Sequence, residues 1–249
     1  DMHQLHKDWY DWTLKGGQKP AFLKQRVAYY VLGSNEWKYA ASLETLASET
    51  RRLYLDSPGT ANDVFVSGTL KSDLPSVSPS DSYIYDPLDT RPGDAEKEDG
   101  DENYLVDQTA DLNLFGGGLV YHSAPFAEAT EISGFLKLTA WVQIDVPDTD
   151  FMVTLAEILP DGGYIQLTRD LKRARYRESM KVEKLVTPGE IICYEFDSFM
   201  FFSRLVSKGS RLRLTFASPN SIQLQKNYNS GGVVAEETGA DARTAHITL

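Results

Sequence analysis

Apolar and polar residues alternate along most of the chain from Leu53 onward. In the runs 136–145, 151–156 and 211–216, an apolar side chain occupies nearly every second position. This period of two is typical of strands that place one face on a core. Clusters of Pro, Gly, Asn and Asp separate the runs and indicate short turns. Around ten such strands without a long helical pattern between them predict a mainly β protein, a jelly-roll β-sandwich.

The first part of the chain has a different pattern. Leu5, Trp9 and Trp12 recur at the spacing of one helical stripe, and Lys15 followed by two glycines indicates where the helix ends. The apolar run 27–32 then predicts a strand covered on both faces. One helix and one strand form a single α/β unit, which cannot be a domain by itself. Together with the start at Asp1, this predicts that the chain is a piece of a longer protein.

The segment 86–111 breaks the strand rhythm. It holds ten acidic and two basic residues, which is −8 of the net charge of −11, and it contains prolines and glycines. We therefore predict a long, solvated surface loop. Oxygen-rich turns can bind calcium, but the spacing from Asp94 to Glu102 does not fit the 12-residue calcium loop. We predict no metal and no cofactor here.

Composition excludes several classes of protein. An isoelectric point near 4.8 argues against nucleic-acid binding, and the longest apolar runs are too short to span a membrane. The single cysteine, Cys193, excludes an internal disulfide and a cysteine-based zinc cluster. Because it lies in the apolar run 191–196, we expect it to be buried. No secretory leader is visible, which favours a cytoplasmic protein over a secreted one.

Residues that could catalyse a reaction are scarce. The chain contains no G-x-S-x-G motif, and the adjacent His122 and Ser123 would point to opposite faces of a strand. His3 and His6 share a helical face but have no third metal ligand, and His246 lies in a closing strand with a structural role. We therefore predict no catalytic residue in this chain.

Two other patterns indicate binding surfaces. Arg173, Arg175 and Arg177 alternate and would place three guanidinium groups on one strand face, which is either solvated or an interdomain contact. Among the tryptophans, Trp141 alone lies in a sandwich strand. An aromatic platform can bind sugars, so a free-standing carbohydrate- or peptide-binding module is the alternative function.

A series of motifs then becomes recognisable by its order and spacing. The motifs are Trp9-Tyr10-Asp11-Trp12, Tyr83-Ile84-Tyr85-Asp86-Pro87, Asp148-Thr149-Asp150-Phe151, Arg173-Ala174-Arg175-Tyr176-Arg177-Glu178, Pro188-Gly189-Glu190 and Asn227-Tyr228-Asn229-Ser230-Gly231-Gly232. Together they resemble the C-terminal domain of the X-Pro dipeptidyl-peptidase and cocaine-esterase (CocE/NonD) serine hydrolases. The resemblance extends over nearly the whole chain.

The resemblance implies a domain organisation. Residues 1–38 would be the last helix and strand of an α/β-hydrolase domain, and residues 39–249 a galactose-binding-like jelly roll. The Ser-Asp-His triad of the family lies before the helix that resembles residues 5–15, so none of it falls in this chain. The partner would be the α/β-hydrolase domain of the same enzyme, which Trp9 and Trp12 would contact.

The resemblance also implies a role at the substrate site. In this family a loop after the Tyr-x-Tyr-Asp-Pro motif helps to wall the acyl pocket. Here it would be the segment 86–111, with Tyr104, Leu105 and Val106 as pocket-lining residues. The intact enzyme would act on a small acyl ester or peptide, and it could be a homo-oligomer.

Overall fold

The computed structural model describes residues 2–46, 49–76, 79–98 and 116–249. Within them the helices are α1 (Met2–Lys15) and α2 (Arg91–Glu98), with short 3-10 turns at Ala174–Tyr176 and Gly239–Asp241. The strands are β1 (Val27–Val31), β2 (Glu36–Ala40), β3 (Tyr54–Asp56), β4 (Gly68–Lys71), β5 (Ser82–Tyr85), β6 (Gly118–Ser123), β7 (Thr130–Gly134), β8 (Leu138–Ile144), β9 (Asp150–Ile158), β10 (Tyr164–Arg173), β11 (Ile191–Phe196), β12 (Phe202–Val206), β13 (Arg211–Ala217) and β14 (Ala245–Thr248).

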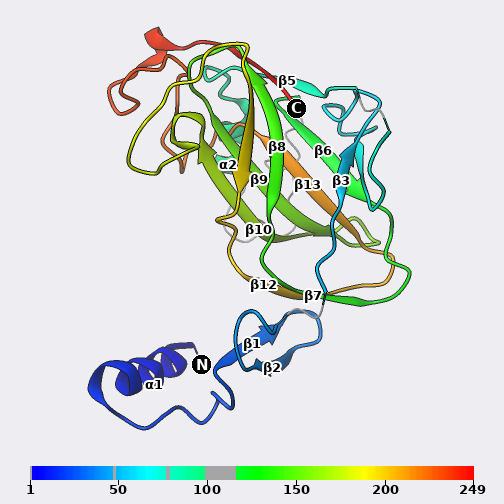
Figure 1. Ribbon diagram of the computed structural model, residues 1–249, viewed down its shortest axis with the longest axis vertical. Helices are drawn as coiled ribbons and strands as arrows, with labels where there is room; N and C mark the ends of the chain where they lie inside the picture. Colours follow the sequence, from blue (N-terminus) through cyan, green and yellow to red (C-terminus); the bar gives the residue numbers. More distant parts are fainter. Residues whose placement is uncertain (1, 47–48, 77–78, 99–115) are drawn as a thin grey trace.

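Two large sheets form the body of the molecule. The six-stranded sheet has the order β10-β9-β13-β6-β4-β3, and the four-stranded sheet has the order β11-β8-β14-β5. Neighbouring strands run antiparallel except for β4 and β6, which are parallel. Two smaller pairs, β1-β2 and β12-β7, connect this body to helix α1, which Figure 1 shows standing apart from the large sheets.

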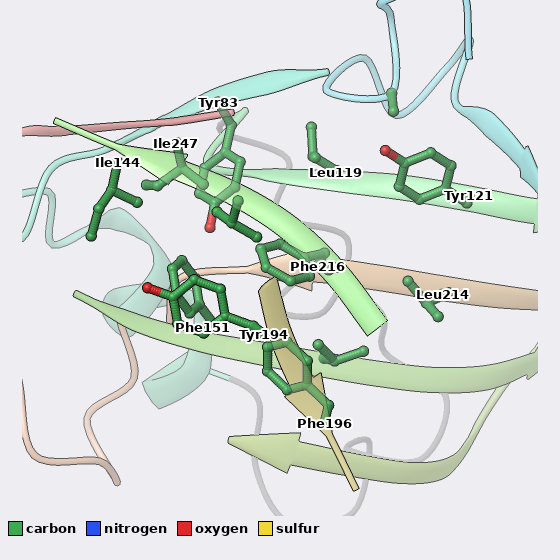
Figure 2. Packing of buried hydrophobic residues seen from close by; sticks show 14 of the residues in the cluster. Tyr83, Leu119, Tyr121, Ile144, Phe151, Tyr194, Phe196, Leu214, Phe216 and Ile247 are labelled. Atoms are coloured by element: carbon green, nitrogen blue, oxygen red, sulfur yellow. The ribbon is translucent and has the colours of Figure 1, made fainter. Parts of the chain in front are cut away.

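Aromatic side chains from both large sheets fill the space between them (Figure 2). Phe151 packs edge-on against Tyr194 with ring centroids 5.0 Å apart, and Phe216 lies 5.4 Å from Phe151 and 5.8 Å from Phe196. All four rings are almost completely buried. Burial of each such ring contributes about 1.5–3 kcal/mol, so this cluster is a main source of stability.

The alternation in the sequence is confirmed by these strands. In β13, Leu212, Leu214 and Phe216 belong to the core. The mainly β fold predicted from the sequence is therefore confirmed. The jelly-roll and galactose-binding-like assignments stay predictions.

The N-terminal helix and a strand in the run 27–32 are confirmed, but the expectation that this strand is covered on both faces is wrong. Helix α1 ends at Lys15, and Gly17 N donates a hydrogen bond to Asp11 O just beyond it. Strand β1 pairs antiparallel with β2 as a two-stranded hairpin and is not covered on both faces. Of its residues only Val31 is buried, and Tyr30 is 38% exposed. The division of the chain at residue 38 stays a prediction.

Two expectations about individual segments are also wrong. Cys193 is exposed, because Tyr194 and Phe196 take the inward positions of β11 and leave the odd-numbered residues outside. Strand β10 ends at Arg173, and the following 3-10 turn removes Arg175 and Arg177 from the strand face on which we expected them.

The acidic segment 86–111 is not entirely loop, since it contains the short helix α2. Glu96 fixes this helix by accepting hydrogen bonds from Ser221 Oγ and from the backbone N–H of Ile222. Tyr104, Leu105 and Val106 lie outside the described residues. Among the described residues, neither helix has the length and apolar character needed to cross a bilayer.

Candidate functional site

Helix α1 and the β1-β2 hairpin form an open aromatic groove of about 760 Å³, which we call the N-terminal groove. Trp9 lies 5.5 Å from Trp12 in edge-on contact, so the two tryptophans predicted to share a helical stripe are brought together. Across the groove, Trp37 contacts both Phe22 and Tyr30. The lining residues are Leu5, His6, Trp9, Tyr10, Phe22, Leu23, Arg26, Val27, Ala28, Trp37, Ser42, Leu43 and Glu44.

The aromatic residues of this groove are incompletely covered. Trp9 is 40% exposed, Trp37 is 43% exposed, and no residue of α1 is buried. A helix of 14 residues is marginal in water without a packed face. A concentration of exposed aromatics of this kind is typical of an interaction surface.

The hairpin, in contrast, is attached to the sandwich. Leu32 N donates to Ser203 O, and Leu205 N donates back to Leu32 O, which forms a bridge to β12. Lys38 forms an ion pair with Glu131 on β7. The hairpin side of the N-terminal groove is therefore attached to the β-sandwich.

The predicted arginine cluster is divided among partners within the same domain. Arg175 is 4% exposed, and its Nε donates to Asp148 at 2.8 Å. Arg173 forms a two-point ion pair with Asp150 at 2.8 and 2.9 Å. The Nδ2 of Asn227 joins the two carboxylates by donating to both.

Arg177 differs from the other two arginines because it caps a turn. Its Nη1 donates to the carbonyl oxygens of Ala174 and Lys184. The contacts of all three arginines stabilise the turn after β10, and their predicted role in interdomain contact stays a prediction. The sequence reasoning missed Asp148, Asp150 and Asn227 as their partners, although the spaced Asp-Thr-Asp and Arg-Ala-Arg motifs are the signal that could have identified them.

His122 and Ser123 do not form a catalytic pair. His122 Nε2 accepts a hydrogen bond from Arg213 Nε at 2.8 Å, and its Nδ1 is 3.0 Å from Ser67 Oγ. Ser123 Oγ donates to Ala124 O and accepts from Leu212 N. Burial, together with the charges of Arg213 and Arg211, lowers the pKa of His122 to about 4.

The remaining candidates from the sequence lie apart from one another. Trp141 is 62% exposed on the outer face of the four-stranded sheet, opposite Cys193 on β11. His246 is exposed on β14, whereas His6 lines the N-terminal groove. Within the part of the chain that the structure describes, no group of three His, Cys, Asp or Glu residues is arranged to hold a metal ion.

Comparison with known proteins places this architecture in a family. The model of the X-Pro dipeptidyl-peptidase C-terminal non-catalytic domain matches residues 20–248. The chain is 29% identical over 244 residues to a cocaine esterase from Rhodococcus sp. (strain MB1 Bresler), covering 97% of this chain and 42% of that protein.

Solved structures share the fold. An aminopeptidase from a marine sediment Thaumarchaeota archaeon aligns with a TM-score of 0.76 at 20% identity, over 99% of this chain and 41% of that chain. An α-amino acid ester hydrolase aligns with a TM-score of 0.75 at 18% identity, over 99% of this chain and 42% of that one. A CocE/NonD family hydrolase from Staphylococcus aureus gives a TM-score of 0.61 at 17% identity, covering 99% and 43%.

The chain thus spans about two fifths of the length of these relatives. Since the family model covers nearly all of the sequence, the resemblance noted in the motifs is confirmed. The chain belongs to the family of X-Pro dipeptidyl-peptidase C-terminal non-catalytic domains.

Proposed function

We propose that this chain is the C-terminal portion of a CocE/NonD-type serine hydrolase that cleaves ester or X-Pro peptide bonds through an acyl-enzyme. The chain itself contributes no catalytic residue. It packs on the α/β-hydrolase domain of the same enzyme and gives shape to the substrate pocket. The family membership and the partial coverage of the relatives support this proposal.

The observation that carries the proposal is the N-terminal groove. Its aromatic residues are partly exposed, while the hairpin beneath them is fixed to β12 and β7. A domain packed on α1 would bury Trp9 and Trp12 and would supply the tertiary contacts that a short helix needs. The acyl pocket, the oxyanion hole and the triad would belong to that domain.

A comparison of the chain with its parent protein tests this proposal. We expect the coding sequence upstream of Asp1 to encode a G-x-S-x-G motif followed by a histidine. The parent protein should hydrolyse a p-nitrophenyl ester, and replacement of the motif serine by alanine should abolish that activity.

The purified 249-residue chain should hydrolyse the same ester no faster than buffer. Ser123→Ala is the matched control, because its hydroxyl is already engaged in two hydrogen bonds. Hydrolysis by the chain alone that disappears in Ser123→Ala would refute the non-catalytic assignment. An upstream sequence without a nucleophile motif would refute the proposal that the chain is part of a larger serine hydrolase.

A further inference from the structure

A second, larger cleft of about 930 Å³ lies against the outer face of the six-stranded sheet, bordered by α2 and the segment 218–224. We call it the sheet cleft. On the sheet side it is lined by Met152 and Thr154 of β9, Arg169 of β10, and Thr215 and Ala217 of β13. None of these residues belongs to the N-terminal groove.

The strand register places these residues in two rows. Arg169 lies directly opposite Thr154, which in turn lies opposite Thr215. Directly opposed side chains have Cβ atoms roughly 4.5–5.5 Å apart, so one guanidinium and two hydroxyls form a continuous polar row. In the next row Met152 lies opposite Ala217, which adds an apolar surface beside it.

The polar row has capacity for hydrogen bonds that the protein does not use. In the described part of the chain, Arg169 forms no ion pair or hydrogen bond through its side chain, and neither do the hydroxyls of Thr154 and Thr215. Thr154 and Thr215 are nevertheless only 4% and 6% exposed. A guanidinium and two hydroxyls that face the cleft without a partner among the described residues suit an oxygen ligand.

The acidic residues that line the sheet cleft are engaged in hydrogen bonds or ion pairs, and His246 of β14 lines the cleft as well. Asp89 forms an ion pair with Arg91, and Glu96 accepts hydrogen bonds from the segment after β13. Asp86 accepts a hydrogen bond from Leu88 N. These carboxylates line the part of the cleft formed by the segment 86–96, and they oppose a multiply charged anion such as phosphate more strongly than a single carboxylate held at Arg169.

We propose that the Arg169 end of the sheet cleft binds a carboxylate-bearing small molecule with an apolar body. The guanidinium of Arg169 donates to the planar carboxylate, a geometry that arginine matches with two parallel hydrogen bonds. The hydroxyls of Thr154 and Thr215 supply further donors. Met152 and Ala217 contact the apolar body of the ligand.

Isothermal titration calorimetry on the whole 249-residue chain tests the site with two probes of nearly equal shape. Hippurate carries an aromatic group and a carboxylate, and hippuramide replaces the carboxylate by a neutral amide. We expect saturable binding of hippurate and at least about tenfold weaker binding of hippuramide, since a hydrogen bond to a charged group is worth more than a neutral one.

The variants separate the site from general charge effects. Arg169→Gln should weaken hippurate binding at least about tenfold, and Thr215→Val, which keeps the side-chain shape, about fivefold. Arg211→Gln is the matched control, because Arg211 lies on the same sheet face near its other end, opposite Ile158, and does not line the cleft. It should bind hippurate as the unmodified chain does.

Three outcomes would overturn the proposal: no saturable hippurate binding, equal affinity for hippuramide, or unchanged affinity in Arg169→Gln. Because Arg169 is exposed, its substitution should leave the urea unfolding midpoint unchanged, which is checked in parallel. The site consists of this chain's own residues, so its test is independent of the proposed hydrolase activity.

Discussion

Asp148 holds together three segments that are distant in the sequence. It is completely buried and accepts hydrogen bonds from the backbone N and the Nε of Arg175 and from Asn227 Nδ2. The carboxylate thereby joins the start of β9, the turn after β10 and the segment after β13. Three of the motifs that identify the family in the sequence meet at this one ion pair.

Removal of the charge of Asp148 should be strongly destabilising. Asp148→Asn keeps the side-chain shape but removes the buried counter-charge of Arg175, whose remaining acidic partner, Glu183, is exposed to solvent. We expect the free energy of unfolding, measured with urea, to fall by about 3–5 kcal/mol. Glu178→Gln is the control, since its ion pair with Lys184 is exposed and should contribute less than about 1 kcal/mol. Equal losses in the two variants would contradict the structural role of Asp148.

His122 is a second single residue that affects stability, because its protonation makes stability depend on pH. Its Nε2 accepts from Arg213, and protonation would replace this acceptor by a second cation beside the guanidinium. Burial first, and then Arg213 and Arg211, lower its pKa to about 4 from the ordinary 6.5. Between these two values the unfolded chain binds more protons than the folded chain, so stability is lost as the pH falls.

We expect this linkage to contribute about 1–2 kcal/mol, allowing for screening of a partly exposed ring. The measurement is the urea unfolding free energy at pH values from 7 to about 4. This range includes the ordinary pKa of histidine and the lowered pKa of His122. His122→Gln should show a shallower decline than the unmodified chain, and His246→Gln, which removes an exposed ring, is the control. An identical slope in His122→Gln would refute the assignment.

The hairpin β1-β2 and strand β12 meet where the backbone approaches closely. Gly33 has a φ of +92°, and a Cβ built there would lie 2.8 Å from the carbonyl oxygen of Leu205. Gly162 has nearly the same φ, +90°, but open space around the corresponding position. A comparison of substitutions at the two glycines therefore separates the effect of backbone strain from the effect of steric contact.

Gly33→Ala should weaken the attachment of the hairpin. Both Gly33→Ala and Gly162→Ala incur backbone strain of about 1 kcal/mol, and the contact with Leu205 should add about 1–3 kcal/mol at Gly33 alone. Hydrogen exchange at the Leu205 amide, which donates to Leu32 O, reports the attachment directly. If Gly162→Ala reduces protection at Leu205 as much as Gly33→Ala does, close approach is not the cause.

At the scale of the whole molecule, the N-terminal elements differ in how firmly they are attached. No residue of α1 is buried, whereas Val31 of the hairpin is fully buried. Figure 1 shows the helix at the end of the molecule, beyond the hairpin that links it to the sandwich. This arrangement fits a helix whose main contacts lie on another domain.

Deletion of successive N-terminal segments tests this difference. Removal of residues 1–19 should change the unfolding free energy of the sandwich by no more than about 0.5 kcal/mol, as expected for surface groups. Removal of residues 1–41 takes away Val31 and the bridge to β12 and should cost at least about 2 kcal/mol. Unfolding in urea is followed by circular dichroism. If the removal of residues 1–19 lowers the unfolding free energy as much as the removal of residues 1–41 does, α1 packs on the sandwich.

The sequence by itself determined the family and those helices and strands in which apolar residues recur with a strong period. Alternation in β13 and the tryptophan stripe of α1 predicted a strand and a helix, because side-chain direction follows directly from local backbone geometry. Periodicity failed at β11, where both faces carry apolar residues and the position of Cys193 depended on which face met the core. The helix α2 within the acidic segment was not predicted, because the contacts that hold it come from the segment after β13.

Only the tertiary structure decided which distant residues became partners. The pairing of Arg175 with Asp148 spans 27 positions, and the polar row of Arg169, Thr154 and Thr215 crosses three strands. A one-residue change of register would move such side chains to the opposite face. Ion pairs and clefts of this kind depend on strand order and register, which are set by burial of the shared core and not by the local sequence.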